Sequence, residues 1–221
     1  MIIAVDGPSG AGKSSVCREV AKRLNWSLLD TGAIYRCVAL IALERGVDND
    51  PVACGEIART LDIRFVADKT GQKVFIGDRD VTKEIRTFET TQCVNHVSPM
   101  AEVRAELLGI QRRLGHSVDS IVEGRDIGSV VFPDADLKVY YTASVEARAT
   151  RRMKEFEAKG EHIDFDEVVK QIQMRDETEF NRENSPLVQC DDAVVLDTSE
   201  LSFEDSCRAL IDLIQSVAKK G

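Results

Sequence analysis

A glycine-rich stretch follows directly after the first apolar run of the chain. Residues 2–6 read IIAVD, and residues 7–15 read GPSGAGKSS, with three glycines and one lysine. A short apolar run of this kind indicates a buried strand, and the residues after the glycines are typical of a helix. Between a strand and a helix, residues 7–14 fit the pattern GxxxxGK[ST]. The fold must therefore turn tightly from a strand onto a helix N-terminus.

This pattern is that of a P-loop, which binds the phosphates of a nucleotide. Its glycines let backbone N–H groups and the helix N-terminus converge on the β-phosphate. We expect Lys13 to share its charge between the β- and γ-phosphates, and the Ser14 hydroxyl to ligate Mg²⁺. For Ser15 two roles stay open, contact with the α-phosphate or capping of the helix. The predicted nucleotide-binding residues are Gly7, Pro8, Ser9, Gly10, Ala11, Gly12, Lys13, Ser14 and Ser15.

Five short apolar runs predict the strands of one sheet. They cover residues 2–6, 27–30, 119–123, 137–142 and 193–197. Their hydrophobicity is continuous, as a parallel sheet covered on both faces requires. Helical stretches separate most of them, at 13–25, 33–45, 99–114, 144–159, 164–181 and 202–219. The alternation predicts an α/β fold, a parallel five-stranded sheet with helices on both faces.

One segment departs from this alternation. Residues 62–86 contain strand-like runs around a DKTGQ turn and a second turn at GDRD. This pattern predicts a small antiparallel β insert. Because no linker or internal repeat is present, we interpret the insert as part of one domain.

The amino-acid composition limits the kinds of partner that the chain can bind. The 221 residues include 29 basic and 38 acidic side chains, a net charge of −9, which speaks against binding nucleic acid. No apolar run is long enough to span a bilayer, and Met1 leads straight into a strand, so we expect no signal peptide, no membrane partner and a cytoplasmic location. The six cysteines have neither zinc spacing nor a need for pairing in a chain of this size. The arginines nevertheless gather locally, at 148–152 and 175–182, which favours a small anionic ligand.

A P-loop does not by itself say how the nucleotide is used. A GTPase switch should carry an NKxD-like guanine motif with a DxxG switch, and the sequence has no such pair. An ATP-driven motor is usually larger. Small size and clustered arginines favour a kinase of small molecules.

Polar residues also follow the second and third predicted strands. The stretch LLDTGAIYR covers residues 28–36, and EGRDIGSVVFPDAD covers residues 123–136. Both lie at the carboxyl edge of the sheet, where open α/β folds bind ligands. Arg125 can grip a phosphate, and Asp126 can accept a hydrogen bond from an exocyclic amine.

Together these motifs resemble the bacterial cytidylate kinases, a branch of the nucleoside monophosphate kinases. The motifs DGPSGAGKS, LLDTGAIYR, EIRT, EGRDIGSVVFPDA, RRM and RDETEFNRENSPL occur in that family's order, and the resemblance covers essentially residues 1–221. It implies a single P-loop kinase domain with a nucleoside-monophosphate-binding insert at about 62–98 and a helical lid at about 148–182. It also implies transfer of the γ-phosphoryl group of ATP, with Mg²⁺, to CMP or dCMP by a monomer.

The resemblance assigns roles to individual residues. Arg36 and Arg125 would hold the phosphate of CMP, while Arg104 and Asp126 would read the cytosine edge. Arg148, Arg151 and Arg152 would begin the lid, although salt bridges along an exposed helix are the alternative for each. The CMP-binding residues it implies are Thr31, Arg36, Arg104, Arg125, Asp126, Arg175, Glu179 and Arg182; the catalytic residues are Lys13, Arg125 and Arg152; the metal ligand is Ser14.

Three positions depart from the family's usual pattern. Glu123 and Glu179 stand where aspartate is usual, and Asn95 stands where a serine is expected. Glu123 would be an outer-sphere partner of Mg²⁺, and the longer Glu179 side chain would affect discrimination between ribose and deoxyribose. Two alternatives therefore stay open, a kinase for a different acceptor nucleotide and a nucleotide-binding regulator without turnover.

Overall fold

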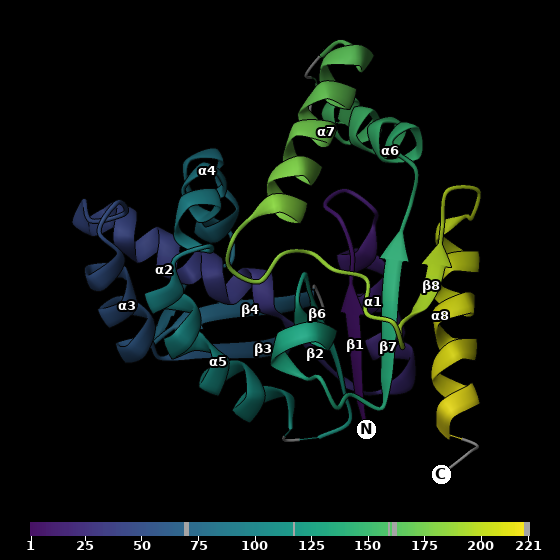
Figure 1. The fold of residues 1–221 in the computed structure, drawn as a ribbon, viewed down its shortest axis with the longest axis horizontal. Helices are drawn as coiled ribbons and strands as arrows, with labels where there is room; N and C mark the ends of the chain where they lie inside the picture. Colours follow the sequence, from purple (N-terminus) through teal and green to yellow (C-terminus); the bar gives the residue numbers. More distant parts are fainter. Residues whose placement is uncertain (69–70, 117, 159, 161–162, 219–221) are drawn as a thin grey trace. The chain divides into compact units, whose positions relative to one another are not determined.

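The computed structural model describes residues 1–68, 71–116, 118–158, 160 and 163–218 (Figure 1). Residues 69–70 of the predicted DKTGQ turn, residues 161–162 of the predicted lid, and residues 159 and 219 at two predicted helix ends lie outside these ranges. Among the described residues, no helix is long and apolar enough to cross a membrane. The chain forms two compact units, unit 1 (Met1–Leu29 with Leu114–Gly221) and unit 2 (Asp30–Arg113).

Unit 1 is built on the five-stranded parallel sheet that the sequence predicts. The strands are β1 (Ile2–Asp6), β2 (Ser27–Asp30), β6 (Ser120–Gly124), β7 (Leu137–Thr142) and β8 (Val194–Asp197), in the order β2-β6-β1-β7-β8. The central strand β1 pairs in parallel with both β6 and β7. Predicted and observed strand bounds agree to within one residue, because continuous apolar runs are a strong signal for buried parallel strands.

Helices α1 (Lys13–Leu24) and α8 (Phe203–Ala218) flank this sheet. Unit 1 also contains α6 (Val145–Ala158) and α7 (Phe165–Asn181), which lie beyond the carboxyl ends of the strands (Figure 1), and a single π-helical turn, η2 (Ile127–Val131). Helices α1 and α8 pack against each other, and Val16, Val20, Leu210 and Ile214 join the buried cluster formed by Ile3, Val5 and Val139. The predicted helices of unit 1 agree with the structure to within one residue at the ends that are described.

Unit 2 contains helices and the small antiparallel sheet. Its elements are α2 (Thr31–Arg45), α3 (Pro51–Thr60), β3 (Ile63–Asp68), β4 (Gly71–Ile76), β5 (Arg79–Asp80), the 3₁₀ turn η1 (Glu84–Arg86), α4 (Phe88–Val97) and α5 (Ala101–Gly115), whose last two residues belong to unit 1. The order β3-β4-β5 confirms the predicted insert. Helices α3 and α4 were not among the predicted elements. Whether residues 62–98 act as an insert within a single domain stays a prediction.

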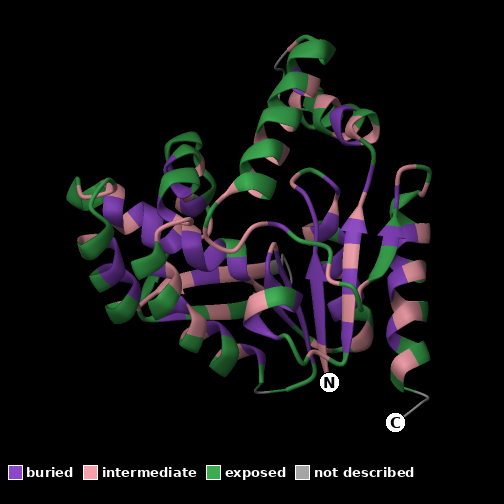
Figure 2. Ribbon diagram, in the orientation of Figure 1, coloured by how far each residue is buried: buried purple, intermediate pink, exposed green. Residues whose placement is uncertain are grey.

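Burial differs sharply between the central strand β1 and the helix pair α6 and α7 (Figure 2). Strand β1 is buried along almost all of its length, whereas α7 has only Val168 buried among its residues. Helices α6 and α7 pack on one another. Since so little apolar surface is covered there, polar contacts must contribute much of what holds this pair in place.

Candidate active site

The glycines of the P-loop are required by backbone geometry. Gly10 and Gly12 have φ angles of 78° and 87°, in the left-handed region that side chains disfavour. At Gly7 a Cβ atom would lie 1.9 Å from the carbonyl oxygen of Tyr141. The loop therefore passes tightly against β7 and leads directly into α1.

Helix α1 begins with backbone N–H groups that are suited to an anion. Its N-cap is Gly12, which has no side chain to cap the helix, and residues 13–24 carry no acidic side chain in the first turn. The N-terminal N–H groups and the helix dipole therefore favour a phosphate. Ser15 is exposed and does not cap this helix, which leaves contact with a phosphate as the open role for it.

Lys13, Ser14 and Glu123 form a polar cluster beside this helix start. The Ser14 hydroxyl donates to Oε2 of Glu123 at 2.7 Å, and Lys13 Nζ lies 3.5 Å from the same oxygen. The Lys13 and Glu123 side chains are 6% and 2% exposed. A hydroxyl and a carboxylate are hard oxygen ligands of the kind that Mg²⁺ prefers, either directly or through water. The cluster thus fits a nucleotide-bound Mg²⁺ ion.

A second cluster gathers three of the predicted CMP-binding residues. Arg125 follows β6, and its Nε donates to Oε2 of Glu179 at 2.8 Å; Nε of Arg175 donates to Oε1 of the same carboxylate at 3.2 Å. Burial alone raises the pKa of Glu179, but the two guanidinium groups outweigh it and lower the pKa to about 2. A single carboxylate therefore holds two predicted phosphate-binding arginines together.

The neighbouring turn is tied to strand β1. Asp126 is buried and precedes η2, and its carbonyl oxygen accepts from the amides of Val130 and Val131. The amides of Ile127 and Gly128 donate to the carboxylate of Asp6, at the end of β1. A residue next to the P-loop thus contacts the segment that bears Arg125 and Asp126.

Unit 2 holds three further predicted CMP-binding residues, Thr31, Arg36 and Arg104. Thr31 is buried at the first position of α2, which Asp30 caps by accepting from the amide of Ala33. Arg36 donates to Oγ1 of Thr91 at 2.7 Å and to the carbonyl of Ile85 at 3.2 Å. These bonds join α2, η1 and α4 through one guanidinium group.

Arg104 lies on α5 in the same unit. Its guanidinium donates to the carbonyl of Ser98 at 3.1 Å and lies 5.3 Å from the ring centroid of Tyr35. A cation over an aromatic ring is attracted to the electron-rich face of that ring. Arg104 of α5 therefore interacts with Tyr35 of α2.

The arginines of α6 differ in their surroundings. Arg148 is only 4% exposed, forms a bidentate pair with Asp176 of α7 and donates to the carbonyl of Ser9 in the P-loop. Arg151 donates to the P-loop carbonyl of Ala11 and to Thr198. Two α6 arginines therefore connect α6 to the P-loop backbone, and one of them also connects it to α7.

Arg152 and Arg182 complete the predicted set. Arg152 is half exposed and pairs with Glu155 one turn along α6, as expected for a salt-bridged helix face. Arg182 follows α7 and donates through Nε to the carbonyl of Ser185 at 2.5 Å. Neither contact assigns a role, and the catalytic role of Arg152 stays a prediction.

Comparison with known proteins decides the family. The family model described as cytidylate kinase matches residues 3–216. A curated cytidylate kinase of Exiguobacterium sibiricum is 47% identical over 98% of both chains, and one of Rhodococcus jostii is 46% identical over 100% of this chain and 97% of its own. The chain belongs to the cytidylate kinase family. A crystal structure of an uncharacterised protein from Eubacterium ventriosum, 11% identical over 98% of both chains, has a TM-score of 0.55 and is similar in fold.

In this member of the cytidylate kinase family, the structure shows which of the predicted site residues contact one another, which the sequence motifs alone do not. Lys13 and Ser14 meet at Glu123, and Arg125 and Arg175 meet at Glu179. Thr31, Arg36 and Arg104 lie together in unit 2.

Sequence reasoning missed Asp6 and Asp176. Asp6 is a charged residue at the end of an apolar run, directly before the P-loop motif, and this position could have singled it out in the sequence. Asp176 stands in the RDETEF motif next to Arg175, but nothing in the sequence pairs it with Arg148.

Proposed function

We propose that this chain transfers the γ-phosphoryl group of ATP to CMP or dCMP, producing ADP and CDP or dCDP. Membership of the cytidylate kinase family supports the acceptor class. The observation that carries the proposal within the molecule is the pair of clusters in unit 1, Lys13 and Ser14 at the helix N-terminus and Arg125 with Arg175 around Glu179. One cluster suits a nucleotide triphosphate with Mg²⁺ and the other suits a phosphate monoester.

On the donor side, Lys13 would bind the β- and γ-phosphates, and the α1 N–H groups would bind the β-phosphate. Ser14 would hold Mg²⁺, with Glu123 as its outer-sphere partner. When bound, Mg²⁺ neutralises charge on the β- and γ-phosphate oxygens. It commonly takes one or two protein oxygens, water and phosphate, so the Ser14 and Glu123 pair is a sufficient protein contribution.

On the acceptor side, Arg125 and Arg36 would hold the CMP phosphate, while Arg175, Arg182 and Glu179 would bind near the ribose and phosphate. Asp126 and Arg104 would read the cytosine edge, which offers one amine donor and two acceptors. The acceptor oxygen of CMP is already anionic, so the reaction needs no strong general base. What it needs is two anions held close together with their charge neutralised.

Lid closure would exclude water from this reaction. Arg148 is buried against the P-loop carbonyl of Ser9, so it would anchor α6 rather than move freely over the phosphates. Arg152 is half exposed and bonded to Glu155, an exchangeable partner, so it would be the arginine that turns toward the transferred phosphoryl group.

The deciding experiment is a coupled ADP-release assay with MgATP and a panel of CMP, dCMP, UMP, AMP and GMP. We expect CMP and dCMP to have the highest kcat/KM. CMP no better than AMP would refute the proposed acceptor. ATP binding without product from any acceptor would instead support a regulator that has lost turnover.

Three further predictions from the sequence stay proposals. We propose a monomer, which size-exclusion chromatography with light scattering would test. We also propose a cytoplasmic location, to be checked by cell fractionation. The absence of nucleic acid binding, proposed on the net charge of −9, is checked by a mobility-shift assay at low salt.

A further inference from the structure

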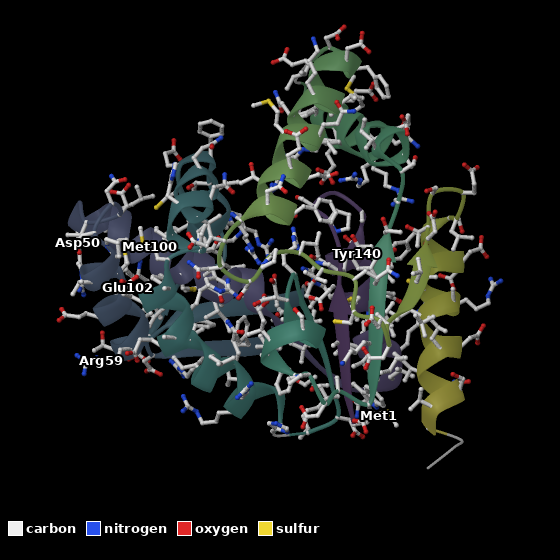
Figure 3. All side chains as sticks on the ribbon, viewed as in Figure 1. Met1, Asp50, Arg59, Met100, Glu102 and Tyr140 are labelled. Atoms are coloured by element: carbon white, nitrogen blue, oxygen red, sulfur yellow. The ribbon has the colours of Figure 1, made fainter. Side chains whose placement is uncertain are left out.

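Asp6 is a buried carboxylate that the proposed reaction does not use. It is the last residue of β1, directly before Gly7, and it is 5% exposed. In the sheet it is registered between Gly124 of β6 and Tyr140 of β7, the latter labelled in Figure 3. Asp6 therefore lies at the carboxyl edge of the sheet, where the P-loop starts and the β6 strand ends.

Both oxygens of Asp6 accept backbone hydrogen bonds from the start of η2. Oδ1 accepts from the amide of Ile127 at 2.9 Å, and Oδ2 accepts from the amide of Gly128 at 2.7 Å. The first N–H groups of a helical turn have no partner within the turn and need one from elsewhere. An ionised carboxylate satisfies both at once, since it is an acceptor at each oxygen.

Gly128 lies between Lys138 and Asp6. A Cβ atom there would crowd Cδ and Cγ of Lys138, at 3.1 Å and 3.2 Å, and would lie at an ordinary van der Waals distance of 3.5 Å from Oδ2 of Asp6. The Gly128 amide thus reaches the carboxylate at a position where the neighbouring space is limited by Lys138.

The buried position of Asp6 disfavours the charged form of its carboxyl group. The pKa of Asp6 is raised to about 6: burial is the main cause and nearby Asp126 adds to it, and together they outweigh the two amides and Lys13, which lower the pKa. Arg125 also interacts with Asp6, as do Tyr140 and Cys190. A side chain needed only to fill this space would be more favourable if it were neutral. A structural filler therefore does not account for Asp6.

We propose that Asp6 is a positioning residue for the acceptor nucleotide: by accepting the Ile127 and Gly128 amides, it fixes the segment that presents Arg125 and Asp126. This inference rests on the proposed function, in which those two residues bind CMP. The contact also ties the acceptor segment to β1, the strand that leads into the P-loop.

The test is Asp6→Asn, assayed by calorimetric binding of CMP and of a non-hydrolysable ATP analogue, with KM values for both substrates. Asparagine has one acceptor oxygen and an NH₂ group, so one of the two amides would face a donor. We expect the dissociation constant and KM for CMP to rise about 10- to 100-fold, and those for the ATP analogue and ATP to change by less than about twofold. Asp50→Asn is the matched control, since the Asp50 carboxylate (Figure 3) also accepts two backbone amides, at an exposed helix N-cap. This control should leave both constants unchanged.

A variant that lacks both presented side chains separates positioning from a general structural role. If Asp6 acts through Arg125 and Asp126, adding Asp6→Asn to Arg125→Ala/Asp126→Ala should change the CMP dissociation constant by less than about threefold. Full additivity would overturn the proposal. So would an equal loss of CMP and ATP-analogue binding in the single variant, or no loss of either.

If Asp6→Asn fails to fold, as judged by circular dichroism, Asp6→Glu disturbs the same contact, because it keeps both acceptor oxygens but moves them by one methylene group. It should show the same selective loss for CMP, and a selective loss for ATP would overturn the proposal. The wild-type acceptor panel tests the proposed function separately. A wild-type protein that prefers CMP while Asp6→Asn behaves normally refutes only the role of Asp6.

Discussion

Glu179 offers the sharpest test of the charged cluster in unit 1. Its two carboxylate oxygens each accept from a different arginine, Arg125 at 2.8 Å and Arg175 at 3.2 Å, and the side chain is 13% exposed. The substitution Glu179→Gln keeps the size of the side chain and removes its charge. It leaves two guanidinium groups facing one neutral amide.

The expected magnitude follows from the pKa of Glu179. Burial raises that pKa, but Arg125 and Arg175 lower it from its ordinary value of 4.5 to about 2. At about 1.4 kcal/mol for each tenfold change in proton affinity, the charged carboxylate contributes about 3 kcal/mol to the free energy of unfolding. Because the folded pKa lies below the unfolded one, this contribution is present above about pH 4.5 and is lost as the pH falls toward 2.

Urea unfolding of the wild-type protein and Glu179→Gln, followed by circular dichroism between pH 7 and pH 3, measures this contribution. We expect the variant to be about 3 kcal/mol less stable at pH 7 and the difference to shrink by about half at pH 3. Glu155→Gln is the matched control, because Glu155 forms an exposed pair with Arg152 and should contribute less than about 1 kcal/mol. A difference for Glu179→Gln that is below about 0.5 kcal/mol at pH 7, or that stays constant down to pH 3, would refute the reasoning.

Further predictions concern the donor, the acceptor and the lid. Lys13→Ala should lower kcat at least about 100-fold in the coupled assay, because the charge on the transferred phosphates is lost, whereas Lys22→Ala, at the far end of α1, should turn over normally. Arg36→Ala should raise the KM for CMP at least about 10-fold with the KM for ATP unchanged; an equal rise in both would contradict the separate acceptor role. Asp176→Asn leaves the buried Arg148 without its bidentate partner and should cost about 3 kcal/mol in urea unfolding; a loss under about 1 kcal/mol would mean that the pair does not hold α6 to α7.

The strands of the parallel sheet were predictable because burial on both faces leaves a continuous apolar run. Helices α3 and α4 were harder to detect. Helix α3 has a start signal in Asp50 and Pro51, but it is short and contains Gly55, where a Cβ would lie 2.9 Å from Cβ of Glu102. Tertiary packing against that neighbour, rather than local preference, accounts for the glycine. Helix α4 has only ten residues, and a helix this short depends on tertiary packing, although its buried residues Thr90, Cys93, Val94 and Val97 recur at helical spacing.

The sequence predicted which residues belong to the candidate site, but not which of them form hydrogen bonds with one another. The motifs supply Arg125, Arg175 and Glu179, but the two glutamate hydrogen bonds span 54 and 4 positions along the chain. The π-helical turn η2 could not be predicted from the sequence either, because its first two amides donate hydrogen bonds to Asp6, more than 120 residues earlier. Local sequence cannot specify a turn whose partner comes from a distant strand.

The charge arrangement of unit 1 explains how an acidic chain can serve two anionic substrates. The buried Lys13 and the partly buried Arg125, both predicted to bind phosphate, each have an acidic partner: Glu123 for Lys13, and Glu179 for Arg125. Without these carboxylates, both cations would face a desolvation cost with nothing to offset it. With them, the cations are held in place by a carboxylate. If Lys13 and Arg125 bind phosphate as proposed, substrate binding would be an exchange of one anion for another, which would lower the affinity for phosphate but spare the ordering of long side chains at that step.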